Sequence, residues 1–312
     1  MEDNREYPMN RREFIKAAAG SVLGMGLTGC VWNKTKKIAE PFSFGVMADV
    51  QYADYECLGN RYYRDSEWKL KQCVADFNSR DLSFVIQLGD LIDGGFHNFD
   101  RMLDIYQKLK VEKYHVLGNH DFAARRDKVI EKLGLESGYY DFAVNRWRFI
   151  VLDGNEISLY ANSKNSEEYK QAKAIHHRLK EASAANAKTW NGALSSRQIA
   201  WLKNVLDKSE TSSEKVIVFC HFPVWPPNAH NLWNDIELVE LFESYDCVIA
   251  YINGHNHAGN YAARNGIHYL TLHGMVESPD KSAYAIVEVH SDRLKILGFG
   301  AEPERLLLIH KP

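Results

Sequence analysis

Short apolar runs rich in β-branched and aromatic residues recur along this 312-residue chain, and each is followed by a polar motif. They cover residues 42–48, 83–88, 112–117, 215–220 and 247–252, and runs of this kind are typical of buried strands. Between the first two, apolar residues at helical spacing predict a helix over residues 65–79, with an apolar face formed by Trp68, Leu70, Val74 and Phe77. The alternation predicts parallel βαβ units whose carboxyl ends meet at one edge of a sheet.

The rest of the chain adds further elements. The pattern predicts helices over residues 99–109, 165–185 and 236–243, and strands over residues 139–144, 147–152, 266–272, 283–289 and 294–299. Ser195 and Gln198 have the spacing of a capping box that opens a helix through Leu206. His176-His177 lies in a polar helical run, so we expect a surface pair. The last three strands resemble a meander closing a second sheet, and residues 41–312 are predicted to form one two-sheet α/β unit.

The N-terminal segment has the pattern of an export signal. Paired arginines, Arg11 and Arg12, precede a short apolar run, and Leu27-Thr28-Gly29-Cys30 resembles a bacterial lipobox. The run is shorter than the roughly 20 residues that a spanning helix needs. We therefore expect residues 1–29 to be a twin-arginine lipoprotein signal peptide, Cys30 to be lipidated and residues 30–40 to be a tether. Such a protein is exported and lipid-anchored, either on the outer side of the bacterial cytoplasmic membrane or on the outer membrane.

Charge and cysteine content narrow the class of protein further. Lys plus Arg is 38 and Asp plus Glu is 41, a net charge of -3, so no broad basic surface for nucleic acid is expected. Besides Cys30 the chain contains Cys57, Cys73, Cys220 and Cys247, without a CxxC pair. Cys220 and Cys247 lie in apolar runs, which favours buried thiols, although four cysteines could also form two disulfides.

Five polar motifs stand at the ends of the apolar runs and share one chemistry. They are Asp49-x-Gln51, Gly89-Asp90-x-x-Asp93, Gly118-Asn119-His120-Asp121, His221 and Gly254-His255-x-His257. The tetrapeptide alone is typical of a plain turn. Carboxylate, amide and imidazole groups collected at one sheet edge, however, are metal ligands and proton-transfer groups.

In this order the motifs resemble those of the calcineurin-like metallophosphoesterases. The resemblance implies a four-layer αββα sandwich with two mixed β-sheets and a dinuclear metal site at the strand ends. It implies that Asp90 bridges two divalent ions, one also held by Asp49, Gln51 and His257 and the other by Asn119, His221 and His255. His120 would protonate or stabilise the leaving oxygen, and Asp121 would orient His120. Asp93 could hydrogen-bond to a residue that binds metal, or it could cap the helix that follows it.

A narrower resemblance rests on Gln51, because a His is the commoner residue at this position. The chain resembles the manganese-dependent ADP-ribose/CDP-alcohol diphosphatases at Gln51 and in six sequence segments, which are residues 48–54, 61–64, 88–94, 191–192, 232–234 and 276–280. The implied reaction is cleavage of the diphosphate of small nucleotide conjugates by a hydroxide held between the metals. The Gln51 oxygen favours a hard ion such as Mn²⁺, with Fe or Zn as alternatives. Animal members have Glu at the position of Asp121 and Cys-Leu-Ala-Trp-Asn where this chain has residues 230–234, which leaves substrate choice open.

Aromatic and arginine residues that lie close in sequence to the metal-ligand motifs are candidates for substrate contacts. We expect aromatic platforms at Tyr52, Trp225 and Trp233 and phosphate contacts at Arg61 and Arg64, with core packing or structural ion pairs as the alternatives. The same metal centre could instead serve a cyclic-nucleotide or broad-specificity phosphodiesterase. A third interpretation is a non-catalytic scaffold lipoprotein that keeps the fold.

Overall fold

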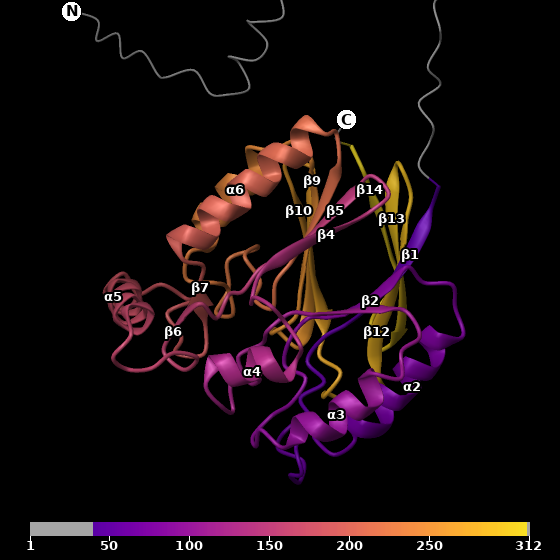
Figure 1. The fold of residues 1–312 in the computed structure, drawn as a ribbon, viewed down its shortest axis with the longest axis horizontal. Helices are drawn as coiled ribbons and strands as arrows, with labels where there is room; N and C mark the ends of the chain where they lie inside the picture. The colour runs from indigo at the N-terminus through magenta and orange to yellow at the C-terminus, as the bar shows by residue number, and fades with distance from the viewer. Residues whose placement is uncertain (1–39, 311–312) are drawn as a thin grey trace, which may run out of the picture. The chain divides into compact units, whose positions relative to one another are not determined.

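Two six-stranded sheets form the centre of the computed structural model, which describes residues 40–310 (Figure 1). The first has the order β14-β13-β12-β1-β2-β3, built from β1 (Phe42–Met47), β2 (Phe84–Gln87), β3 (Glu112–His115), β12 (Ala283–Val289), β13 (Arg293–Gly300) and β14 (Arg305–Leu308). The second has the order β10-β11-β9-β8-β5-β4, built from β4 (Tyr140–Val144), β5 (Trp147–Val151), β8 (Lys215–Phe219), β9 (Val248–Asn253), β10 (Ala258–Arg264) and β11 (Ile267–His273).

Strand direction confirms mixed sheets and corrects one expectation. β1, β2 and β3 are parallel, as are β5, β8, β9 and β11. The other strands, β4, β10, β12, β13 and β14, pair antiparallel with their neighbours. The expected C-terminal meander is divided between the sheets, because β11 pairs with β9 whereas β12 pairs with β1. The carboxyl ends of both parallel groups nevertheless carry the polar motifs.

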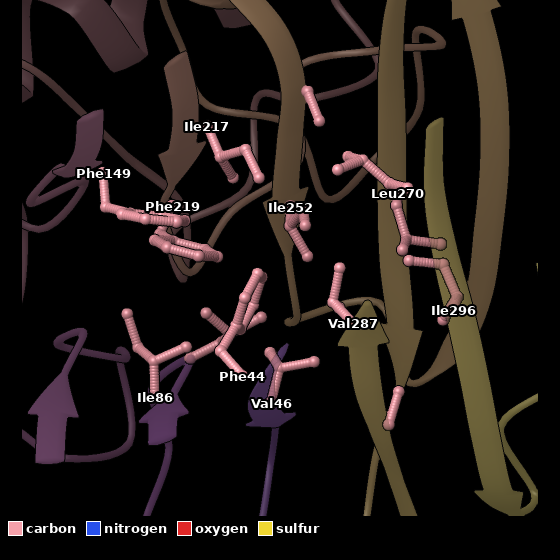
Figure 2. Packing of buried hydrophobic residues seen from close by; sticks show 14 of the residues in the cluster. Phe44, Val46, Ile86, Phe149, Ile217, Phe219, Ile252, Leu270, Val287 and Ile296 are labelled. Carbon is pink, nitrogen blue, oxygen red and sulfur yellow. The ribbon is translucent and has the colours of Figure 1, made fainter. Parts of the chain in front are cut away.

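Apolar side chains from both sheets interlock between them. On β1, Phe44 and Val46 point into this core, whereas Met47 packs on the helix side, as the two-residue period of a strand requires. Phe44 stacks on Phe84 at 4.7 Å and meets Phe149 of the facing sheet edge-on at 5.6 Å. Figure 2 shows Phe44, Val46 and Ile86 opposite Phe149, Phe219 and Ile252.

Helices cover the outer faces and complete four layers. The first sheet is covered by α2 (Ser66–Asn78) and α3 (Asn98–Tyr106), and the second by α6 (Ser196–Thr211) and α7 (Asp235–Glu243). The remaining elements are α4 (Arg126–Lys132), α5 (Glu167–Glu181) and a small ribbon of β6 (Ile157–Ser158) and β7 (Gly192–Ala193). The predicted four-layer α/β sandwich is thus confirmed.

Several local predictions can be checked directly. Ser195 accepts a hydrogen bond from the Gln198 N–H and caps α6, as predicted. Trp68 is 37% exposed, so its assignment to the apolar face of α2 was wrong. Cys220 and Cys247 are buried, as expected. Within residues 40–310 no helix has the length and apolarity needed to cross a bilayer. The predicted signal peptide, the lipidation of Cys30 and most of the tether lie outside the described residues.

Candidate metal centre and active site

The loops after β1, β2, β3, β8 and β9 bring the predicted metal ligands into one cluster. Asp90 lies at its centre and is fully buried. Its Oδ2 accepts a hydrogen bond of 2.9 Å from the Gln51 side chain and lies 3.2 Å from Nε2 of His221. Its Oδ1 accepts a hydrogen bond of 2.8 Å from the backbone N–H of His120. One carboxylate therefore contacts groups from three other loops.

The other predicted ligands continue from this carboxylate. Nε2 of His221 lies 3.1 Å from Oδ1 of Asn119 and 3.1 Å from Nδ1 of His255. Atoms of Asp90, His221 and His255 that could bind a cation lie within 4.8 Å of one another. The backbone N–H of His255 donates to the Asp49 carboxylate, which lies 3.4 Å from Nε2 of His257. The structure thus collects every predicted ligand.

Hydrogen bonds behind the imidazoles aim their free nitrogens into the cluster. Nδ1 of His221 lies 2.8 Å from the Leu88 carbonyl oxygen, which can only accept, so the ring hydrogen is on Nδ1. Nε2 of His255 lies 3.0 Å from Oδ1 of Asn191, whose amide NH₂ donates to two backbone carbonyls. In their neutral forms, His221 through Nε2 and His255 through Nδ1 therefore direct lone pairs toward each other, and a bound cation could accept both.

A carboxylate orients the third imidazole. Nδ1 of His257 lies 2.8 Å from Oε1 of Glu277, which leaves Nε2 to face Asp49. A carboxylate behind a histidine fixes the ring and raises its basicity as a ligand. The roles of Glu277 and Asn191 could not be inferred from the sequence, because both are far along the chain from the rings that they orient.

Gln51 provides the clearest sign that a metal belongs here. Its amide nitrogen donates to Asp90, but its Oε1 is buried without a hydrogen-bond partner. A buried acceptor left without a partner costs about 1–3 kcal/mol, a cost that a bound cation removes. The residue types present fit divalent metal: Asp49, Gln51, Asp90 and His257 could hold one cation, and Asp90, Asn119, His221 and His255 could hold a second.

The comparisons with known proteins agree with this geometry. A family model described as calcineurin-like phosphoesterase matches residues 42–259. The chain belongs to the calcineurin-like metallophosphoesterases. It is thus a hydrolase that acts on phosphoester bonds and uses divalent metal.

Relatives match this metallophosphoesterase over most of its length. The manganese-dependent ADP-ribose/CDP-alcohol diphosphatase of Xenopus laevis is 30% identical, covering 89% of this chain and 94% of the relative. The human protein of the same name is 31% identical, covering 85% and 92%. A crystal structure of a dimetal phosphatase from Danio rerio superposes with a TM-score of 0.78 at 29% identity, covering 86% of this chain and 100% of the other.

The backbone of the metallophosphoesterase is strained where it holds the ligands. Asp49, Gln51, Asp90 and His255 all have positive φ, between 45° and 67°. For residues other than glycine this conformation costs on the order of 1–3 kcal/mol each and is concentrated at functional sites. Backbone hydrogen bonds from Asp49 to Gly89 and from Gln51 to Asp90 hold the conformation. Gly118 is required because a Cβ there would lie 2.1 Å from the Asp90 nitrogen.

Burial and charge set the protonation of the metal-free cluster. Burial opposes ionisation of Asp90, but the charges of His221 and His120 outweigh it and hold the pKa of Asp90 well below its usual range. Despite the opposing effect of burial, Asp90 raises the pKa of His221 to about 9, and Asp49 does the same for His257. Burial and the charge of His221 lower the pKa of His255.

The partner of His120 differs from the prediction. Its Nδ1 lies 3.2 Å from the Asp93 carboxylate. Asp121 was expected to orient His120, and this was wrong: its buried carboxylate accepts hydrogen bonds from the backbone N–H groups of Asp90, Leu91 and Gly118, at 3.0, 2.8 and 2.9 Å. The turn after β3 directs the Asp121 side chain beneath the loop that carries Asp90. Burial and the charge of Asp90 raise the pKa of Asp121 to about 7.

Three predicted substrate contacts are used elsewhere in the fold. Tyr52 is buried and its hydroxyl accepts a hydrogen bond from Arg101, while Trp233 is buried and its indole N–H donates to the Lys188 carbonyl. Arg64 forms ion pairs with two acidic side chains of its own loop, Asp54 and Glu56. These three assignments were wrong, because a residue near a ligand motif can turn equally well into the core or toward its own loop.

The other two predicted contacts remain available. Trp225 is partly exposed, with the Arg264 guanidinium 4.4 Å from its ring centre. The charge of Arg61 acts electrostatically on His120 and on His257. His230, which the sequence did not single out, is a further neighbour of the cluster, with its ring centre 5.4 Å from that of His255.

A hollow opens beside the loop that carries His120. It is lined by residues 122–127 and 160–163. The rings of Phe122 and Tyr160 lie 6.1 Å apart, and the Arg126 guanidinium lies 5.8 Å from the centre of the Phe122 ring. Arg126 forms an ion pair with buried Asp153, and the Tyr160 hydroxyl donates to Asn155. The hollow therefore combines aromatic faces with a fixed cation next to the loop that carries His120.

Proposed function

We propose that this metallophosphoesterase hydrolyses the diphosphate of small nucleotide conjugates of the ADP-ribose and CDP-alcohol type, using two Mn²⁺ ions. The observation that carries this proposal is similarity to relatives named for that activity over 92–94% of their length. The complete set of ligand side chains at the site adds support, as does the oxygen-rich group around Gln51, which suits Mn²⁺ better than a softer ion. The expected products are a nucleoside monophosphate and a second phosphorylated compound.

We assign the metal ligands and His120 different roles in hydrolysis at the phosphorus atom. When bound, two divalent ions polarise the phosphoryl oxygens and lower the pKa of water at the site. The buried Asp90 carboxylate places one anion between both groups of ligands. His120, held by Asp93 through Nδ1, presents Nε2 to the leaving oxygen. Burial opposes protonation of His120, but Asp90 and Asp93 raise its pKa, so it can donate a proton near neutral pH.

We expect the departing half of the substrate and its phosphate groups to contact different residues around the cluster. The departing half would lie on the His120 side, in the hollow with Phe122, Tyr160 and Arg126. Arg61, whose charge acts on both His120 and His257, would meet a phosphate oxygen between them. Aromatic faces and a guanidinium are suited to sugar or base and to phosphate, respectively.

A substrate panel tests the proposal. Purified chain with added Mn²⁺ is incubated with ADP-ribose, CDP-choline, cyclic AMP and bis(p-nitrophenyl) phosphate, and Asp90→Asn is the control for contaminating activity. We expect the highest kcat/KM on the diphosphate conjugates and none of these activities in Asp90→Asn. Cleavage of cyclic AMP without the conjugates would identify a cyclic-nucleotide phosphodiesterase, and efficient cleavage of the aryl diester alone would identify a broad phosphodiesterase.

We also propose, from the sequence, that the chain is exported and anchored through a lipid on Cys30. Residues 1–29 carry the twin-arginine and lipobox patterns that support this location. An extracytoplasmic hydrolase would meet nucleotide conjugates outside the cytoplasm. Loading of the metal before export is consistent with twin-arginine transport of folded proteins.

A further inference from the structure

A buried lysine on α2 binds a strap of backbone beneath the metal centre. Lys69 is fully buried, and its Nζ donates to the successive carbonyl oxygens of Met275, Val276 and Glu277 at 2.9, 3.1 and 3.2 Å. Among residues 40–310, no carboxylate lies within ion-pair distance of this ammonium. Buried lysines normally have a carboxylate partner. Here backbone carbonyls take its place.

The strap, residues 274–277, links this ammonium to the ligand loops. On its other edge, the N–H groups of Met275 and Val276 donate to the carbonyls of Ala48 and Asp49, at 3.1 and 2.9 Å. At its end stands Glu277, whose carboxylate holds Nδ1 of His257. The strap is therefore fixed to the Asp49 loop on one side and to Lys69 on the other, and it carries the group that orients a metal ligand.

We propose that Lys69 is a positioning residue for the metal held by Asp49, Gln51, Asp90 and His257. Three carbonyl dipoles that converge on one point repel one another unless a cation separates them. Without the ammonium the strap shifts, Glu277 loses its fixed position and the His257 ring is free to turn away from Asp49. Desolvation of Lys69 lowers its pKa to about 8, only partly offset by Asp65 and Glu277, so the ammonium is still charged at neutral pH. The proposal rests on the metal assignment made above, and not on the substrate.

Calorimetric titration of the metal-free protein with Mn²⁺ tests this role without an activity assay. We expect Lys69→Met and Glu277→Gln each to weaken one of two binding events by about 10-fold or more, the range for residues that orient a ligand, and to leave the other within about twofold. Because both act through His257, the double variant should bind no more than about twofold weaker than the weaker single variant. Lys71→Met, on the same helix but exposed and paired with Glu67, should match the wild type.

Several outcomes would overturn the proposal. Native Mn²⁺ binding in Lys69→Met, equal weakening of both events, or fully additive losses in the double variant would each contradict it. Asp49→Ala serves as a separate control: if that variant keeps both events, the metal assignment itself is wrong. Should Lys69→Met fail to fold by circular dichroism, Lys69→Gln, which keeps amide donors, replaces it with a smaller selective loss expected. Native binding or equal loss of both events in Lys69→Gln would overturn the role.

Discussion

Oδ2 of Asp93 lies 3.2 Å from Nδ1 of His120 and leaves the other ring nitrogen free. The neighbouring carboxylate of Asp121 instead holds backbone N–H groups beneath the ligand loop. Two acidic residues that the sequence places near one histidine therefore have separate roles. Asp93 orients the His120 ring, whereas Asp121 holds the conformation of the loop that carries Asp90.

This division predicts different effects of substitutions at His120 and Asp93. His120→Ala should retain both metals by elemental analysis and reduce kcat by about 10²-fold or more, the usual contribution of a positioned acid. Asp93→Asn should reduce kcat less. Because the carboxylate raises the pKa of His120, its loss should move the alkaline limb of the kcat profile to lower pH. Unchanged turnover in His120→Ala would remove His120 from this role.

The protonation of the cluster predicts how Mn²⁺ affinity depends on pH. In the metal-free chain the pKa of His221 and of His257 is raised to about 9, so both rings are protonated at pH 7 and must lose a proton to bind metal. Affinity should therefore rise between pH 6.5 and 9, and binding should release protons. Titrations in buffers with different ionisation enthalpies measure that release. Affinity independent of pH over this range would contradict the assignment of both histidines.

The same shifts make a prediction about the stability of the metal-free protein. Each raised histidine pKa contributes stability that is fully present below about pH 6.5, the unfolded value, and is lost as the pH rises toward 9. Urea unfolding in EDTA should show a decline over this window. The decline should be smaller in His257→Gln, which cannot titrate. An identical decline in that variant would place the titrating group elsewhere.

Gln51 should tune the choice of metal. Its unpartnered Oε1 offers an oxygen to the metal that also faces His257. Gln51→His replaces this oxygen with imidazole nitrogen and should shift preference from Mn²⁺ toward Zn²⁺, whereas Gln51→Leu should weaken Mn²⁺ binding with no gain for either ion. Competition titrations with both metals measure the ratio. An unchanged Mn²⁺ to Zn²⁺ ratio in Gln51→His would mean that residue 51 does not contact the metal.

The proposed location depends on a single thiol. In a host with lipoprotein processing, the full-length chain should label with a fatty-acid analogue and fractionate with membranes, and Cys30→Ser should abolish both. Replacing Arg11 and Arg12 with lysines should block export while leaving folded, metal-loaded protein in the cytoplasm. Membrane association and labelling that persist in Cys30→Ser would exclude a lipid on this residue.

Much of the fold could be predicted because buried strands and their polar ends are local signals. The apolar runs before Asp49, Asp90 and Asn119 are visible in the sequence, and parallel pairing of these strands brings their polar ends together. β10 and β14 were missed, because their residues are mostly half-exposed and their strand form depends on pairing with β11 and β13.

The details of the site were harder to predict, since they depend on side-chain direction. Adjacency suggested that Asp121 orients His120, but successive residues of a tight turn point to different sides. Tyr52 and Trp233 are close in sequence to ligand motifs, yet both pack into the core. Glu277 lies in the segment 276–280 that carries the family resemblance, but neither its contact with His257 nor the role of Lys69 could be predicted, because these contacts join segments far apart in the chain.

The ligand cluster around Asp90 is proposed to cleave a nucleotide diphosphate linkage in the presence of Mn²⁺. The most direct measurement is phosphorus NMR of ADP-ribose that has been incubated with the Mn²⁺-loaded protein and then freed of paramagnetic Mn²⁺ on a chelating resin, with Asp90→Asn in parallel. We expect loss of the diphosphate signals and growth of two phosphomonoester signals, those of AMP and a ribose phosphate, with no change in the variant. Intact ADP-ribose with the wild type, or equal cleavage by Asp90→Asn, would contradict the proposed function.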